Sequence, residues 1–450
     1  MGLKISARLT PLNTLKLSVL LCSKLSAVIL FFLASSCNNK ERININRTVY
    51  IRSDNGKYSL IRNSQPYFIT GAAGHTSLAK LKEVGGNTIR TYDTLNLGSI
   101  LDDAQKNNLA VMVGLPIPES EHAAFIYNKP EARDKQLRDI RNLVNRYKNH
   151  PAVLMWCLGN ELDFSPNIKL YHFYKAFNKL VETIHQDDPN HPVTTTMKNL
   201  YPKNLFCISM FTKVDVLSTN IFISLDEMKE ELEKVSWFWQ GPFIISEWGI
   251  EGPWLKKRNA WGARIEETSH KKAERYREMY QYIPHDNPRF LGSFVFYWGF
   301  KQETTHTWFS MFDENGNKSE AVGVMQSLWT GKNTQARSPD LNYMLVNKKG
   351  AMDNIILKPG EAATAILDIL KPDSSHYTLW EIYPEDWFLS KNEKNNKKLR
   401  PVGEVIISSG YFSADFKAPS KEGPYRIFAT VYNKSGYFAT CNTPFYVVSN

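Results

Sequence analysis

Apolar runs of strand length alternate with helix-length amphipathic segments through most of this chain. The runs predict eight strands, at residues 67–71, 88–92, 110–115, 153–158, 193–197, 216–222, 243–246 and 293–298. Helix-length segments lie between them, at 76–84, 100–106, 131–147, 168–185, 225–237 and 271–283. The run at 153–158 is apolar on both faces, which is typical of a parallel strand covered by helices on each side.

Eight strands that alternate with helices predict an α/β fold, a closed (β/α)₈ TIM barrel over residues 50–330. An open doubly wound sheet is the alternative, but no glycine-rich phosphate loop follows the first strand. At the start of this region, Asp54-Asn55-Gly56-Lys57 separates two short strand-like runs and predicts a hairpin.

The helical rhythm stops near residue 330, and a polar linker at 331–341 follows. Residues 342–450 show short alternating runs punctuated by proline and glycine, which predicts a small all-β sandwich domain. Such a domain beside a barrel is more often a brace than a glycan-binding module.

Residues 1–37 have the pattern of an export signal: scattered positive charges, an apolar core and then small residues. Their end, Leu33-Ala34-Ser35-Ser36-Cys37, resembles a bacterial lipobox, in which the cysteine carries lipid. A plain signal peptide and an uncleaved anchor helix are the alternatives, although the apolar core is short for a membrane span. The expected product is a lipoprotein of the bacterial cell envelope, tethered to the outer membrane through residues 38–49 and facing the periplasm or the surface.

Charge and cysteine content narrow the function classes. The formal net charge is +10, of which the leader supplies four, and the remaining basic residues are scattered. No basic stripe or recognisable module indicates a nucleic-acid partner. Outside the leader and the lipobox, Cys157, Cys207 and Cys441 are widely spaced and odd in number, so neither a disulfide framework nor a zinc site is indicated. No cofactor or metal is expected.

A glutamate follows the end of two of the predicted strands. Glu161 follows the fourth strand in Leu158-Gly159-Asn160-Glu161, and Glu247 follows the seventh in Ile245-Ser246-Glu247. The fourth and seventh strands lie nearly opposite each other across a barrel, so both carboxylates can reach one pocket at its mouth. Retaining glycosidases need two such carboxyl groups about 5–5.5 Å apart, one as acid/base and one as nucleophile. If Glu161 and Glu247 were unrelated loop carboxylates, their positions after two opposite strands would be two independent coincidences.

These motifs resemble the signature of glycoside hydrolase clan A, and the barrel is most similar to the family 2 catalytic domain. It is also similar to β-1,3-glucanosyltransferase-type barrels. The resemblance implies that Glu161 is the acid/base and Glu247 the nucleophile. It further implies that Asn160 holds the sugar 2-hydroxyl, that Arg90 hydrogen-bonds the nucleophile, and that Trp298 floors the subsite of the reacting sugar.

The loops after strands one, two, seven and eight supply further candidate substrate contacts: His75, Asp93, Trp254, Glu303, His306 and Trp308.

Two departures from family 2 stand out. The sandwich follows the barrel, whereas family 2 enzymes usually carry sandwich domains before it. Phe222 ends the sixth strand where relatives often have a tyrosine that touches the nucleophile, which puts robust activity in doubt unless a neighbour such as Tyr297 supplies the hydroxyl.

The leading hypothesis is therefore a lipid-anchored retaining β-glycosidase that acts on an oligo- or polysaccharide, with β-glucan as the first candidate by family analogy. A transglycosidase is the near variant. The alternative from another class is a non-catalytic glycan-binding lipoprotein built on a glycosidase barrel. A structural envelope protein would leave the paired carboxylates unexplained.

Overall fold

The computed structural model describes residues 48–118, 125–222, 225–333, 338–389 and 399–449. The predicted leader, Cys37 and all but the last two residues of the predicted tether lie outside these described residues. Within the described part of the chain, no helix is both long enough and apolar enough to cross a membrane.

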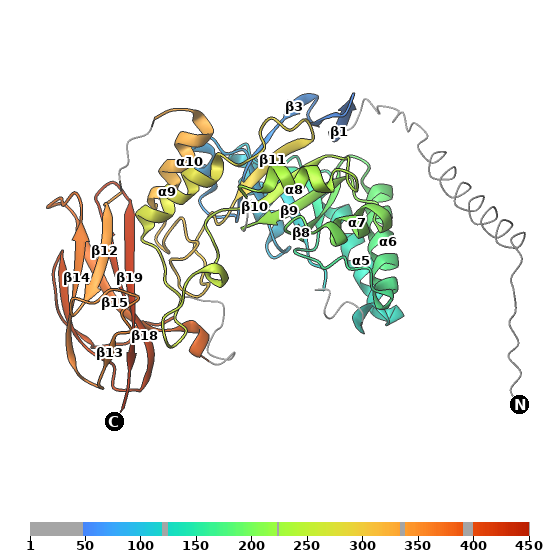
Figure 1. Cartoon of the computed structure of the whole chain (residues 1–450). Coiled ribbons are helices and arrows are strands. Elements are labelled where there is room, and N and C mark those ends of the chain that lie inside the picture. Colours follow the sequence, from blue (N-terminus) through green and yellow to red (C-terminus); the bar gives the residue numbers. More distant parts are fainter. Residues whose placement is uncertain (1–47, 119–124, 223–224, 334–337, 390–398, 450) are drawn as a thin grey trace, which may run out of the picture. The chain divides into compact units, whose positions relative to one another are not determined.

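Eight parallel strands form a closed barrel, which confirms the predicted fold (Figure 1). Its strands are β4 (Ile69–Ala73), β5 (Thr88–Arg90), β6 (Ala110–Leu115), β7 (Val153–Leu158), β8 (Val193–Lys198), β9 (Val216–Ile221), β10 (Phe243–Trp248) and β11 (Phe290–Val295). Pairing of β11 with β4, in which Gly292 lies opposite Ile69, closes the ring. The first strand begins two residues later than predicted, and the eighth begins and ends three residues earlier.

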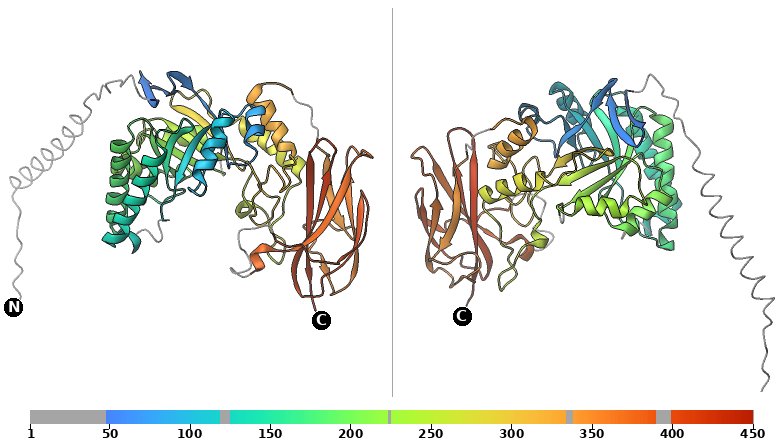
Figure 2. Two further views of the ribbon diagram at one scale, coloured as in Figure 1. Left: turned by 180° about the vertical axis from the view of Figure 1, so that it is seen from behind. Right: turned by 45° about the horizontal axis from the view of Figure 1, so that its top comes forward.

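Helices lie around the outside of the barrel strands (Figures 1 and 2). They are α2 (Leu78–Glu83), α3 (Leu97–Lys106), α5 (Pro130–Tyr147), α6 (Tyr171–Asp187), α7 (Pro202–Phe211), α8 (Met228–Val235), α9 (Ser269–Tyr280) and α10 (Glu320–Thr330). The predicted segments missed α7, which begins at a proline, and α10. Proline is well suited to the first turn of a helix because its missing N–H would have no partner there.

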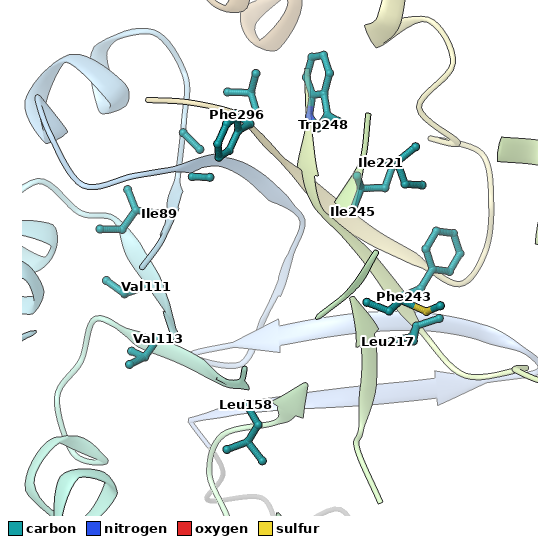
Figure 3. Close-up of a cluster of buried hydrophobic side chains, with 14 of the residues drawn as sticks. Ile89, Val111, Val113, Leu158, Leu217, Ile221, Phe243, Ile245, Trp248 and Phe296 are labelled. Atoms are coloured by element: carbon teal, nitrogen blue, oxygen red, sulfur yellow. The ribbon is translucent and has the colours of Figure 1, made fainter. Parts of the chain in front are cut away.

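Side chains alternate across each barrel strand, as a pleated strand requires. Val111 and Val113 belong to the apolar layer between strands and helices (Figure 3), whereas Met112 faces the barrel interior. Val49 and Leu60, from β1 (Val49–Asp54) and β2 (Lys57–Arg62), complete the interior cluster. The predicted hairpin, extended by β3 (Gln65–Tyr67), therefore closes the end of the barrel at which its strands begin. The opposite end, where the strands finish, is left for a site.

The last part of the described chain is the predicted all-β domain, and it consists of two four-stranded sheets. One contains β12 (Leu341–Val346), β14 (Ala362–Ile369), β17 (Ser413–Lys417) and β16 (Ile406–Ser409). The other contains β13 (Ile356–Leu357), β19 (Phe438–Val447), β18 (Gly423–Tyr432) and β15 (Tyr377–Pro384). Apolar side chains from both sheets form one shared core, which is the arrangement of a sandwich.

A buried ionic cluster joins this sandwich to the loops after β10 and β11. Asn442 of β19 donates a 2.8 Å hydrogen bond to Glu266, which also pairs with Lys272 and accepts hydrogen bonds from Thr305 and Thr307. Arg426 of β18 contacts the same asparagine at 2.6 Å. Its cationic neighbours lower the pKa of Glu266 despite its complete burial, so the cluster holds a charged carboxylate. The two loops that border the open end of the barrel are thus fixed to the sandwich.

Candidate active site

Four polar side chains stand where barrel strands end. Arg90 is the last residue of β5, Asn220 lies near the end of β9, Glu247 is the penultimate residue of β10, and Glu161 comes three residues after β7. Parallel strands all finish at the same edge, so chain segments far apart in sequence bring these groups together. The site lies at the end of the barrel opposite the hairpin.

Glu247 accepts two hydrogen bonds on one of its oxygens. Arg90 Nη1 lies 2.7 Å from Oε1, and the Tyr92 hydroxyl lies 2.8 Å from the same atom. Arg90 is 1% and Glu247 4% exposed, so the pair is shielded from water. Among the described residues, no hydrogen bond to Glu247 Oε2 is formed, which leaves that oxygen available for bond formation.

Five acceptors hold the Arg90 guanidinium in place. Besides Glu247, Nη1 donates to Asn220 Oδ1 at 3.1 Å and to the Ser246 carbonyl at 3.0 Å. Nη2 donates to Asn160 Oδ1 at 2.6 Å and to Thr196 Oγ1 at 3.2 Å. Because both terminal nitrogens of this planar cation are hydrogen-bonded, the guanidinium is fixed and holds the Glu247 carboxylate in one position.

Asn220 connects the two glutamates. Its amide nitrogen donates to Glu161 Oε1 at 3.0 Å and to Asn160 Oδ1 at 3.2 Å, and its oxygen accepts from Arg90 and from Ser246 Oγ. Glu161 itself has a left-handed backbone, with φ of 53°. That conformation is costly for a residue with a side chain and is concentrated at functional sites. One hydrogen-bonded network therefore includes both carboxylates.

Burial and neighbouring charges shift the pKa values of Glu247 and Tyr92 in this network. Burial raises the pKa of Glu247, an effect that Arg90 and Tyr92 oppose and the nearby Glu161 carboxylate reinforces. Burial and the charge of Glu247 raise the pKa of Tyr92 well above its ordinary value. Tyr92 therefore keeps its proton at neutral pH and acts as the hydrogen-bond donor to the carboxylate.

Two predicted tryptophan contacts are wrong, because their rings are buried. Trp298 is completely buried, and its ring lies 5.0 Å from that of Phe312 and 6.1 Å from that of Trp329 on α10. It packs inside the protein and does not floor an open subsite. Trp308 is also buried, and its indole nitrogen donates to the Glu251 carbonyl at 3.1 Å.

Other predicted contacts are accessible at least in part. Trp254 is 41% exposed and packs edge-on against Phe222, with ring centres 5.9 Å apart. His75 and Asp93 are exposed on the loops after β4 and β5. Glu303 is half-buried and pairs with Lys301 at 2.9 Å.

His306 belongs to the junction with the sandwich and is buried between Tyr383 and Phe428, so it is not available to a substrate. No group of three or more His, Cys, Asp or Glu side chains in the described ranges is placed to hold a metal ion.

The sequence reasoning missed Tyr92 and Asn220. A buried polar pair, Thr219-Asn220, near the end of an apolar strand was the available signal for Asn220. Tyr92 lies only two residues beyond the predicted Arg90, but nothing in the local pattern directs its hydroxyl to a residue 155 positions later. The sequence suggests that a neighbour such as Tyr297 supplies the hydroxyl that Phe222 lacks, whereas in the structure Tyr92 donates it to Glu247.

Comparisons with known proteins find similar barrels. Residues 98–281 match the family model for glycosyl hydrolases family 2, TIM barrel domain. The β-glucuronidase of Rattus norvegicus is 27% identical over 187 residues, which cover 38% of this chain and 26% of that protein. The β-glucuronidase of Paenibacillus borealis is 26% identical over 190 residues, covering 38% and 30%. The chain thus matches less than a third of the length of either relative.

Solved structures share the fold at low identity. The family 2 β-galacturonidase from Eisenbergiella tayi bound to galacturonate superposes with a TM-score of 0.50 and 17% identity, covering 63% of this chain and 54% of that one. The Bifidobacterium dentium β-glucuronidase complexed with coumarin-3-O-glucuronide gives a TM-score of 0.51 and 18% identity, covering 64% and 49%. These two superpositions establish a common architecture.

Proposed function

We propose that this protein is a retaining β-glycosidase. Its barrel matches the glycoside hydrolase family 2 domain, as the sequence resemblance predicts. The observation that carries the proposal is the network in which Asn220 and Arg90 join Glu161 to Glu247. Double displacement requires two carboxyl groups that flank one glycosidic bond, and this hydrogen-bonded network includes both carboxylates at the mouth of the barrel.

In this mechanism each carboxylate has one task at a time. Glu161 protonates the leaving oxygen while Glu247 Oε2 attacks the anomeric carbon and forms a glycosyl-enzyme ester. Glu161 then removes a proton from water, or from a sugar hydroxyl in a transglycosidase, which releases the sugar with retained configuration. Asn160 uses its oxygen to accept from Arg90 and Asn220, so its amide hydrogens remain for the sugar 2-hydroxyl.

For the sugar itself, we propose a β-linked uronic acid. The names of the related proteins, β-glucuronidase and β-galacturonidase, support this class and do not support the β-glucan expected from sequence. A uronate carboxylate needs a cation or several donors. Lys301 is near enough to lower the pKa of Glu247, and Lys198 at the end of β8 has its ammonium 5.8 Å from the centre of the Trp254 ring. Both are candidates for that contact.

The test is a substrate panel applied to the chain from residue 38 onward. It contains 4-nitrophenyl β-glucuronide, β-galacturonide, β-glucoside and β-galactoside, together with β-glucan, mannan, xylan and galactan, and it includes a Glu247→Gln control. We expect turnover of a uronide, β-configured initial product by NMR, and loss of activity in the control. Equal activity in Glu247→Gln would refute double displacement through Glu247. Silence of the folded wild-type chain on every substrate would overturn the proposal in favour of glycan binding without catalysis.

The envelope location is a separate proposal that rests on the sequence of residues 1–37 alone. If Cys37 is lipidated, a bacterial host fed with an alkyne-tagged fatty acid will label the chain, and Cys37→Ser will abolish the label. Labelling that survives the substitution would place the lipid elsewhere and remove this assignment.

A further inference from the structure

We propose that Tyr92 is a catalytic residue, whose hydroxyl stabilises the charge that returns to Glu247 when the glycosyl-enzyme is cleaved. This inference rests on the proposed double displacement. Tyr92 is not part of the strand-end motifs. Its hydroxyl donates to the nucleophile, which Phe222 cannot do because it has no hydroxyl.

The geometry places the Tyr92 hydroxyl on the carboxylate oxygen that does not react. Tyr92 Oη and Arg90 Nη1 both donate to Glu247 Oε1, at 2.8 and 2.7 Å. Attack therefore falls to Oε2, and the ester carbonyl of the intermediate would be formed by Oε1. Arg90 also holds the phenol ring, because its guanidinium carbon lies 4.7 Å from the ring centre.

The two steps of the reaction use this hydrogen bond differently. In the first step Glu247 loses its negative charge as the new bond forms, so the donors stabilise the starting carboxylate at least as well as the transition state. In the second step water adds to the anomeric carbon, the bond to Oε2 breaks, and the electron pair returns to the carboxylate. Donors fixed on Oε1 stabilise that developing charge without reorganisation. The hydroxyl of Tyr92 should therefore act mainly on deglycosylation.

Residue 222 is free to serve another purpose once Tyr92 supplies the hydroxyl. The Phe222 ring packs edge-on against Phe296 at 5.3 Å and against Trp254 at 5.9 Å, with interplanar angles of 85° and 87°. An apolar ring suits that aromatic cluster. The phenylalanine is thus compatible with an active site in which the donor to the nucleophile comes from the end of β5.

The experiment compares Tyr92→Phe with Tyr425→Phe. The control removes a tyrosine hydroxyl that donates to the Lys421 carbonyl at 2.9 Å inside the sandwich. With an activated aryl glycoside, we expect Tyr92→Phe to lower kcat by a factor of about 10 to 100, the range for a hydrogen bond to a charged group. KM should fall with kcat, and intact-protein mass spectrometry after acid quench should show more glycosyl-enzyme. The control should match the wild type.

A second measurement does not depend on turnover. The carboxyl carbons of ¹³C-labelled glutamates are titrated by NMR, and the Glu247 signal is identified by its loss in Glu247→Gln. We expect a higher pKa for Glu247 in Tyr92→Phe than in the wild type, because a donor to the charged form has been removed.

The outcomes separate the two proposals. If the wild type is inactive on all substrates but the pKa of Glu247 is raised in Tyr92→Phe, the glycosidase proposal is refuted, while the hydrogen bond from Tyr92 to Glu247 is supported. An active wild type whose Tyr92→Phe variant retains kcat, and an unchanged Glu247 titration, would each overturn the role of Tyr92. A fall in kcat/KM with unchanged adduct would assign Tyr92 to a structural role.

Discussion

Replacing Arg90 with methionine should destabilise the folded protein strongly at neutral pH, because it leaves the Glu247 carboxylate buried without its cation. Arg90 is 1% exposed and makes hydrogen bonds to five acceptors, three of them side chains from β8, β9 and β10. Breaking a buried ion pair by removing one partner costs about 3–5 kcal/mol of unfolding free energy. Methionine fills part of the space, so the lost cation dominates over the lost volume.

The size of this effect should depend on pH in a defined direction. Burial already raises the pKa of Glu247, and removal of Arg90 takes away the main opposing effect. In the variant the folded state therefore binds a proton at Glu247 more tightly than the unfolded chain, whose glutamates titrate at about pH 4.3. The free energy of unfolding must then fall as the pH rises through the folded pKa. The difference from wild type should be smaller at pH 5 than at pH 8.

Urea unfolding followed by tryptophan fluorescence at both pH values measures this difference. The double variant Arg90→Met/Glu247→Gln is the decisive control, since it removes the charge whose burial causes the loss. We expect it to be more stable than Arg90→Met alone at pH 8. A double variant no more stable than the single one, together with a loss that is equal at the two pH values, would refute the electrostatic reasoning and leave packing as the cause.

Three further predictions follow from the same site. Glu247→Ala should lose nearly all activity, and azide should restore it with inverted product; full activity without azide would remove the nucleophile assignment. Glu161→Gln should slow glycosides with poor leaving groups far more than activated aryl glycosides, and an equal effect on both would contradict its role as acid. Phe222→Tyr should leave kcat within about twofold and cost about 1 kcal/mol in stability, because the hydroxyl enters an aromatic cluster; a large gain in kcat would show that Tyr92 does not replace it.

The main features of this fold could be predicted from sequence because the physical signals are local. Apolar runs with polar ends located all eight barrel strands, and six of the eight began at the predicted residue. Helix α7 was missed because its apolar residues do not gather on one face, and it leaves Phe206 and Phe211 exposed while burying Asn204. Local patterns identify an element most safely when its exposed and buried positions separate cleanly.

The assignment of Trp298 failed for a related reason. The eighth strand was predicted at 293–298, but β11 spans Phe290–Val295, so Trp298 lies beyond the strand in a loop. A shift of three residues changes which side chains face the mouth of the barrel. The direction of a side chain beyond the strand end then depends on the geometry of the loop. There the ring of Trp298 packs against Phe312 and Trp329. An aromatic residue near a strand end therefore indicates a sugar platform only when its direction is known.

The substitution at Phe222 shows the limit of reasoning from one strand end at a time. The absence of a hydroxyl there suggests a weakened nucleophile, yet the Tyr92 hydroxyl donates to Glu247, to the same oxygen that Arg90 contacts. In a barrel every strand ends near the same space, so a donor to a central carboxylate can come from several strands. What the chemistry requires is a donor at Oε1, whatever its position in the chain. A missing residue in a motif therefore argues against activity only after all the neighbouring strand ends have been examined.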